Sequence, residues 1–340
     1  MPETIPASII VIVILALGFD FVNGFHDTAN SIATSISTRV LSPLKAILLA
    51  VVCNFLGALV FTLLLNTKNV AGTIASDVVN NKMINPTVII AALIGAIIWN
   101  LITWYFGIPS SSSHALIGSL IGASVTYTMS TDVLKISGIV DKIIIPLFTS
   151  PIVGFLLGFY IMKLVAILFN RFSQSTMNKW FSKLQIFSSA AVAFFHGSND
   201  AQKSMGIITM ALITADLNGG NTHTQPWVVI LCAITMAIGT SVGGWRIIKT
   251  VGMNMIKMNP VQGFVAQTSA AVSIAFADIY KAPISTTHVI TTAVMGVGAS
   301  KRLSAVRWAL ARNIVWAWVL TIPVTMIIGG LMTLLIKLFI

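Results

Sequence analysis

The sequence predicts an all-α polytopic membrane protein made of two inverted-topology repeats of about five crossings each, with broken or re-entrant helices at its polar motifs. Hydrophobic residues make up 56% of the 340 residues and charged residues only 9%, and the mean hydropathy is +0.93, far from the values of soluble domains. The apolar residues form long runs. Two polar motifs interrupt these runs, and both recur in the second half in the same order. A duplicated membrane unit with a matching polar motif in each copy is typical of secondary transporters.

Most of the apolar runs reach the length of about 20 residues that a helix needs to cross a bilayer. Five runs fall in each half, and an odd number of crossings per half gives the two halves opposite orientations in the membrane. We therefore expect a first membrane repeat over residues 1–169, a cytoplasmic amphipathic linker over 170–183 and a second repeat over 184–340. The runs cover residues 5–38, 44–66, 86–106, 110–129, 143–168, 184–215, 226–246, 261–280, 284–300 and 312–338.

The net charge of +11 could indicate a nucleic-acid partner, but the positions of the basic residues indicate a membrane instead. When each run is counted as one crossing, most lysines and arginines fall into loops on one side. We expect that side to be cytoplasmic, in the cytoplasmic membrane of a bacterium or archaeon, with the lipid bilayer and no nucleic acid as partner. The basic loops on this side are residues 39–45, 163–183, 246–257 and 301–312.

The first polar motif lies inside runs that are too long for one crossing. It reads NGFHDTANSIAT at residues 23–34 and HGSNDAQKSMGIIT at residues 196–209. As straight helices the two host runs would be about 50 Å long, against a hydrocarbon core of about 30 Å. Gly24 and Gly197 favour a helix break within them. Such a break would expose backbone N–H groups at a new helix N-terminus, where an anion can bind.

The second polar motif is a cluster of hydroxyl side chains. It reads IPSSSSHALIG at residues 108–118 and APISTTHVITT at residues 282–292. Pro109 and Pro283 stand ahead of the clusters, where proline suits the start of a helix and serine or threonine suits its cap. A helix N-terminus lined with hydroxyls can cradle a tetrahedral oxyanion. The residues expected to bind it are Ser111, Ser112, Ser113, Ser285, Thr286 and Thr287.

The carboxylates Asp27 and Asp200 of the first motif would repel such an anion, so they require another role. A carboxylate at membrane depth is costly and usually functional. We expect these two, with Asp20, to hold a coupling cation, either Na⁺ as a bound metal ion or a proton. Lys203 either meets the anion or neutralises Asp200. The amide side chains that can add ligands are Asn23, Asn30, Asn199 and Gln202.

The histidines of the motifs have separate predicted roles. His114 and His288 are expected to be structural hydrogen-bonding residues, and His26 and His196 either structural residues or proton carriers. An intramembrane hydrolase would use Ser113 and His114 with an aspartate. However, the sequence has no nucleophile elbow, and a catalytic serine needs no duplicate. We therefore expect no enzyme, and a channel remains an alternative that saturable, gradient-dependent uptake would distinguish.

Five motifs in the chain, GFHDTAN, PSSSSH, HGSNDAQK, GTSVGGWRIIKTVG and PISTTH, together resemble the inorganic phosphate transporter (PiT) family over essentially the whole sequence. The form with His26 is similar to the low-affinity phosphate permeases of bacterial inner membranes. The resemblance implies an inverted-repeat carrier that imports phosphate by alternating access with Na⁺ or H⁺, without another cofactor. Whether the chain forms a homodimer is left open. The resemblance also implies cation and substrate ligands at Asp27, Asn30, Asp200 and Gln202, with the six clustered hydroxyls around the anion.

Two positions depart from the family pattern. Many members have a glutamate where this chain has Asn54 and another where it has Gln267. An amide can coordinate Na⁺ but cannot titrate, so these residues move the question of coupling to the aspartates and histidines. A sulfate permease of the same fold is the main alternative, because both anions are tetrahedral and the same cradle suits both.

Overall fold

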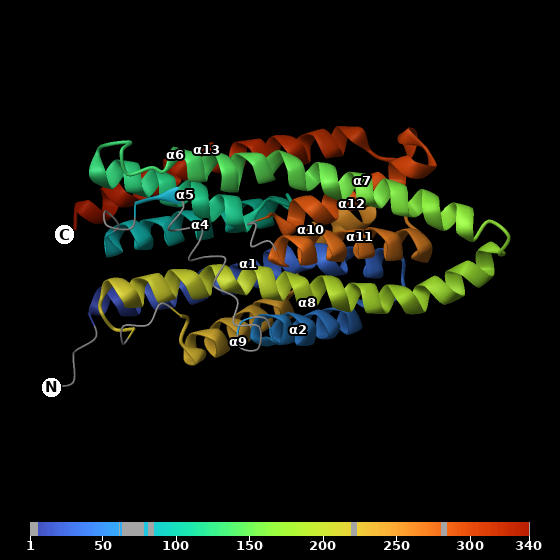
Figure 1. Ribbon diagram of the computed structural model, residues 1–340, viewed down its shortest axis with the longest axis horizontal. Coiled ribbons are helices and arrows are strands. Elements are labelled where there is room, and N and C mark those ends of the chain that lie inside the picture. Colours follow the sequence, from blue (N-terminus) through green and yellow to red (C-terminus); the bar gives the residue numbers. More distant parts are fainter. Residues whose placement is uncertain are drawn as a thin grey trace.

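The computed structural model describes residues 6–60, 62, 78–80, 85–218, 223–279 and 284–339. These residues form an elongated bundle of helices (Figure 1), and every apolar run expected from the sequence contains one. The all-α prediction is confirmed. Proline stands in the first turn of α2 (Pro43–Leu59), α4 (Pro86–Phe106) and α9 (Pro226–Val242), where its missing N–H group costs no helical hydrogen bond.

Within the described residues, five long helices fall in each half of the chain. The first half has α1 (Ala7–Ser37), α2, α4, α5 (Ser112–Thr128) and α7 (Ile145–Leu168), with the short α6 (Ile136–Ile139) and η3 (Val140–Ile144) ahead of α7. The second half has α8 (Gln174–Thr214), α9, α11 (Pro260–Ile279), α12 (Thr286–Lys301) and α13 (Trp308–Lys337). The short α10 (Trp245–Ile248) and η4 (Lys249–Asn254) follow α9, and η5 (Leu303–Ala305) precedes α13.

Four of the described helices, α1, α4, α7 and α13, are long and apolar enough to cross a membrane on their own. A fifth span results if α9 and the helix after it, bent by 63°, count as one. The helices α5 and α12 have 17 and 16 residues, about 25 Å, so neither crosses a 30 Å core alone. Figure 1 shows the α4–α5 hairpin toward one end of the bundle and the α11–α12 hairpin toward the other. This arrangement agrees with the expected re-entrant helices.

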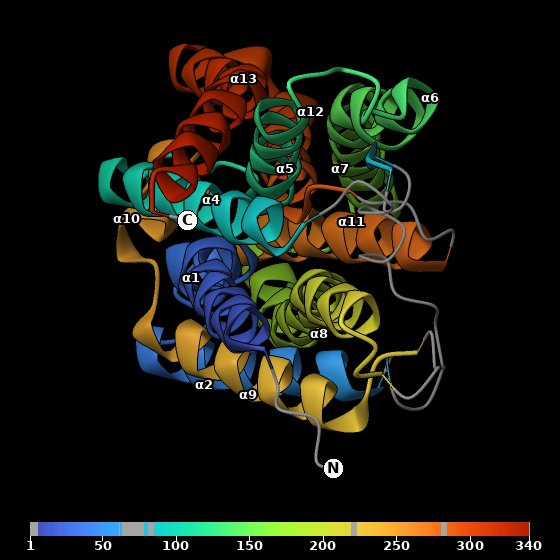
Figure 2. The same cartoon turned by 90° about the vertical axis from the view of Figure 1, so that its left-hand side faces the viewer.

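The helix contacts pair the two halves in a regular way. α7 packs against α12 as α13 packs against α5, and α2 packs against α8 as α9 packs against α1. α4 contacts α1 and α5 as α11 contacts α8 and α12. In Figure 2, α1 and α8 lie side by side with α2 and α9 beneath them. Exchanging the halves thus maps each of these contacts onto another, as repeats require, while their inverted orientation in the membrane remains a prediction.

The apolar core lies mainly between α1, α4, α8 and α9, where Phe19, Met205 and Met236 are fully buried. The outer helix α7 instead exposes large apolar side chains, including Phe148 and Leu164. An exposed apolar helix face of this kind suits contact with lipid.

The expected breaks in the first-motif helices are wrong, because α1 and α8 both continue through the motif. The two glycines serve close packing instead. A Cβ atom on Gly24 would lie 2.5 Å from the carbonyl oxygen of Met236 on α9, and one on Gly197 would lie 2.3 Å from that of Asn54 on α2. The backbones approach so closely that only glycine fits at these positions. The sequence does not distinguish a glycine that permits close packing from one that breaks a helix.

The first ten residues of α8 belong to the expected linker. Ser173 caps the helix by accepting a hydrogen bond from the backbone N–H of Thr176, and the helix then runs unbroken for 41 residues, about 60 Å. Figure 1 shows that the α7–α8 and α12–α13 connections share one end of the bundle, and the chain around each is basic, with four lysines and arginines in residues 163–183 and four in residues 301–312. That is the arrangement the expected cytoplasmic side requires.

A pair of glycine substitutions on α1, one at the contact with α9 and one away from it, tests this close packing. We expect Gly24→Ala to lower the melting temperature of the detergent-solubilised protein. The added methyl group would overpack the interface, which lowers the free energy of unfolding by about 1–3 kcal/mol. Gly18→Ala on the same helix is the control. Its Cβ atom would meet only a side-chain carbon of Ile97, at 3.9 Å, and alanine is the better helix former. Equal melting temperatures for the two variants would contradict this packing.

Candidate functional site

Two helix N-termini face each other inside the bundle. α5 begins after Ser111 and α12 after Ser285, and each cap hydroxyl accepts a hydrogen bond from the backbone N–H three residues on, at 3.3 and 3.2 Å. The expected helix starts are present, although Pro283 lies outside the described residues. The rings of His114 and His288 have their centroids 5.0 Å apart, which places the two helix starts together.

The hydroxyl clusters are buried and reach across to the first motif. Thr287 donates a hydrogen bond from Oγ1 to Oδ1 of Asp27 at 3.0 Å, and Asn30 donates from Nδ2 to the same hydroxyl at 3.0 Å. A residue of the second half therefore contacts the aspartate of the first half directly. None of the cluster residues is more than 4% exposed: Ser111, Ser112, Ser113, Ser285, Thr286 and Thr287.

A chain of hydrogen bonds leads to Asp27 from the α4–α5 hairpin. Nδ1 of His26 lies 2.7 Å from Oδ1 of Asp27, and Nε2 lies 3.0 Å from the hydroxyl of Thr103 on α4. Ser110 donates a hydrogen bond to Thr103 at 2.8 Å. Sequence reasoning missed both hydroxyl residues. The run of four serines gave a signal for Ser110, whereas a single threonine in an apolar helix such as Thr103 gives none.

Both carboxylate oxygens of Asp200 have polar contacts in the described structure. Lys203, one turn further along α8 and only 1% exposed, donates a hydrogen bond from Nζ to Oδ1. Asn23 on α1 donates from Nδ2 to Oδ2 at 3.2 Å, and Nε2 of His196 lies 3.3 Å from Oδ2. The sequence left two roles open for Lys203, and its contact with Asp200 favours neutralisation of that carboxylate.

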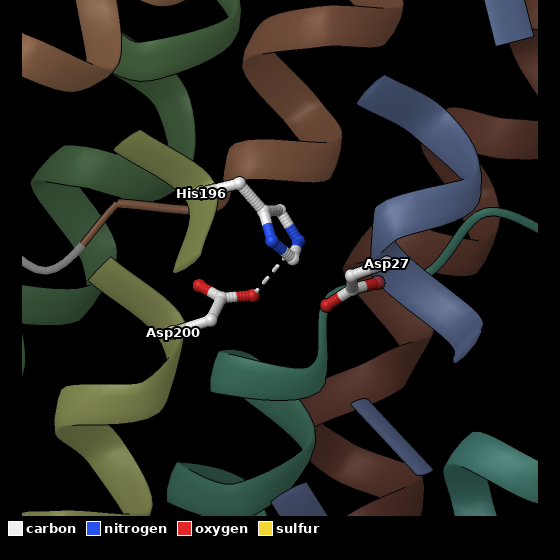
Figure 3. A group of neighbouring side chains, drawn as sticks. All are labelled: Asp27, His196 and Asp200. Atoms are coloured by element: carbon white, nitrogen blue, oxygen red, sulfur yellow. Dashed lines mark ion pairs between the residues drawn. The ribbon is translucent and has the colours of Figure 1, made fainter. Parts of the chain in front are cut away.

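Asp27, His196 and Asp200 form one buried cluster, with a ligand atom from each within 4.8 Å of the others. Figure 3 shows the His196 ring reaching the space between the two carboxylates, which come from α1 and α8. Two carboxylates and an imidazole can hold a metal ion or share a proton. Na⁺ would take its ligands from the carboxylates and nearby amides, because hard cations prefer oxygen, whereas the imidazole suits a proton.

The remaining residues expected near the cation are also buried. Asp20 on α1 accepts a hydrogen bond at 3.0 Å from Ser204, the residue after Lys203. Asn199 and Gln202 lie within the same motif on α8 and are at most 2% exposed. All the polar residues singled out in the first motif therefore lie inside the bundle.

The two amides at the positions where the family resemblance implies glutamates, Asn54 and Gln267, both bond to neighbouring helices. Asn54 donates from Nδ2 to the hydroxyls of Thr28 and Thr240, both at 2.9 Å. Gln267 donates to the backbone oxygen of Ser31 at 3.0 Å and accepts hydrogen bonds from two serine hydroxyls of α8. An ionised glutamate would lose these donors, so the amides fit their partners better.

The hydrogen-bonding role expected of His114 and His288 stays a prediction, and the described structure shows ring contacts at both. Neither ring nitrogen of His288, nor Nδ1 of His114, has a hydrogen-bond partner among the described residues, although both rings are buried. His288 instead stacks on Trp318, with ring centroids 4.0 Å apart, and Trp318 donates its indole N–H to the backbone oxygen of Pro109 at 2.9 Å. Buried polar atoms without a partner beside two helix N-termini are features of a binding site.

These features define a multi-pass membrane protein with a charged and hydroxyl-lined site where its two halves meet. Residues 23–329 match the model of the phosphate transporter family, and the chain belongs to that family. A "probable low-affinity inorganic phosphate transporter" of Bacillus subtilis is 48% identical over 95% of each chain. One of the same description from Rhizobium meliloti is 45% identical over 94% of each chain.

A solved structure described as "the sodium-dependent phosphate transporter" has the same fold. It superimposes with a TM-score of 0.87, covers 98% of this chain and 100% of its own, and is 24% identical in sequence. The family resemblance drawn from the motifs is confirmed. Because the relatives are transporters, the protein is a transporter and not an enzyme, and the hydrolase alternative is excluded.

Proposed function

We propose that this protein imports inorganic phosphate across the cytoplasmic membrane by symport with Na⁺ or H⁺. The observation that carries the proposal is the meeting of two helix N-termini, one from each half, lined by buried serines and threonines. Backbone N–H groups and hydroxyls at a helix N-terminus bind oxyanions, and the helix dipole favours their charge. The descriptions of the relatives support phosphate as the oxyanion.

The proposed coupling rests on the carboxylate that touches the anion cradle. Asp27 bonds to Thr287, so an anion held by the clusters would lie close to a negative charge. A cation bound at Asp27 removes that repulsion, and the carrier then moves both ions together. The solved neighbour's description as sodium-dependent supports Na⁺. The contact of Asp27 with His26 supports a proton.

The proposed transport cycle is alternating access between the two halves, residues 1–169 and 184–340. The candidate site is built from both halves, and the helix contacts are exchanged when the halves are swapped. An exchange of these matching contacts can therefore open the site to each side in turn, while the hydrogen bonds between the halves keep the site assembled.

Radiolabelled phosphate uptake into proteoliposomes tests the transported anion. We expect saturable uptake that collapses when the Na⁺ and proton gradients are both dissipated, and that a hundredfold excess of sulfate leaves largely intact. Phosphate near neutral pH can donate a hydrogen bond to a buried carboxylate, whereas sulfate only accepts. If sulfate excess abolished uptake, the substrate would be sulfate. Uptake that did not saturate would indicate a channel.

Alanine substitutions test the cradle. We expect Ser112→Ala and Thr286→Ala each to weaken phosphate affinity roughly tenfold to hundredfold, because one hydrogen bond to a charged ligand contributes about 1.5–3 kcal/mol. Ser124→Ala is the matched control, since Ser124 is equally buried but lies three turns further along α5. Wild-type affinity in both cradle variants would remove these residues from the binding site.

Asp27→Asn tests the coupling ion. The substitution keeps the shape and removes the charge, so the variant should still exchange internal for external phosphate but fail to accumulate it against a gradient. Asp132→Asn, at an exposed position bonded to Ser130, is the control for a lost carboxylate. Imposing Na⁺ and pH gradients separately on wild-type vesicles identifies the ion. Concentrative uptake by Asp27→Asn would show that Asp27 does not carry it.

A further inference from the structure

The two copies of the first motif differ in charge at one position. Alignment of Asp27 with Asp200 places Asn30 opposite Lys203, each three residues after its aspartate. Asn30 donates to Thr287 in the opposite half, whereas Lys203 donates to its own aspartate. The repeated backbone thus carries an amide in one copy and an ammonium group in the other.

The surroundings of the two aspartates differ in the same way. In the described part of the chain no lysine or arginine lies within 4 Å of Asp27, which contacts only the imidazole of His26 among basic side chains at that distance. Asp200 holds both the ammonium of Lys203 and, on its other oxygen, Asn23 and His196. An ammonium carries the same single positive charge as an alkali cation, and it donates hydrogen bonds to a carboxylate oxygen that an alkali cation would coordinate.

The position of Lys203 excludes an ordinary surface role. The side chain is 1% exposed and is among the largest fully buried side chains of the described residues. Lysine is almost never fully buried unless it is paired, and a lone charge at membrane depth would be costly. Lys203 and Asp200 therefore stay paired, and the next residue, Ser204, donates a hydrogen bond to Asp20.

We propose that Lys203 is a resident cation that takes the place of a transported cation at Asp200, so that only the Asp27 side of the site binds a coupling ion. This inference rests on the proposed cation-coupled transport. At Asp200 the positive charge beside the carboxylate belongs to a side chain of the same helix. At Asp27 the positive charge would come from a cation bound from solution.

Lys203→Asn tests the inference, because it installs the residue of the first copy. In proteoliposomes at fixed pH, we expect the variant to carry one Na⁺ more per phosphate than the wild type, measured with radiolabelled Na⁺ and phosphate. Its uptake should fall in choline and recover with Na⁺. Lys203→Arg should keep the wild-type ion ratio, and the double variant Asp200→Asn/Lys203→Asn should lose the added Na⁺ requirement, since no carboxylate is left to fill.

A binding measurement covers the case in which Lys203→Asn inserts but does not transport. Replacing choline by Na⁺ should raise the melting temperature of the solubilised variant more than that of the wild type, because a ligand that binds only the folded state stabilises it. Equal Na⁺ effects on melting and equal ion ratios would overturn the inference. Failure of wild-type phosphate uptake would instead overturn the proposed function, and the melting comparison would still decide the role of Lys203.

Discussion

Burial of three carboxylates inside an apolar helical bundle is the constraint on which the rest of the structure depends. Each needs hydrogen bonds or an opposite charge at a depth where water cannot supply them. Asp27 accepts from Thr287, Asp200 from Asn23 and Asp20 from Ser204. Every one of these donors comes from the opposite half of the chain. Asp27 also contacts His26, and Asp200 also contacts Lys203, within their own halves. Each of the three carboxylates nevertheless takes a hydrogen bond from the other half, so the polar site helps to hold the halves together.

Such bonds across the halves require backbones that approach closely, and this explains the glycines of the first motif. Gly24 and Gly197 bring α1 onto α9 and α8 onto α2 at distances that no other residue allows. The packing seats the two motif helices side by side (Figure 2), with their aspartates facing one another. Small residues at helix contacts are the usual solution in membranes, where apolar side chains gain little by leaving lipid.

The sequence predicted the helices, the hydroxyl caps and the buried aspartates, because apolar length and the repetition of motifs are local signals. It misjudged Gly24, since a glycine that permits packing and one that breaks a helix look alike in sequence. Thr103 was missed because its partner His26 lies 77 residues away in the chain. The sequence likewise did not show that Lys203 contacts Asp200, because that contact is made only in the folded chain.

The similarity of the halves and the difference in their charges act on different steps of transport. In the proposed alternating-access cycle, the matching helix contacts would give the inward-open and outward-open states comparable packing, so that movement between them would cost little free energy. The charges break that equivalence. Lys203 lies one turn from Asp200 on the same helix, so in the proposed cycle the two side chains move together as a pair. Asp27 has no tethered ammonium within contact distance in the described residues. Under the proposed coupling, the occupancy of Asp27 would therefore differ between the two sides, and a carrier can couple phosphate only to an ion whose occupancy changes.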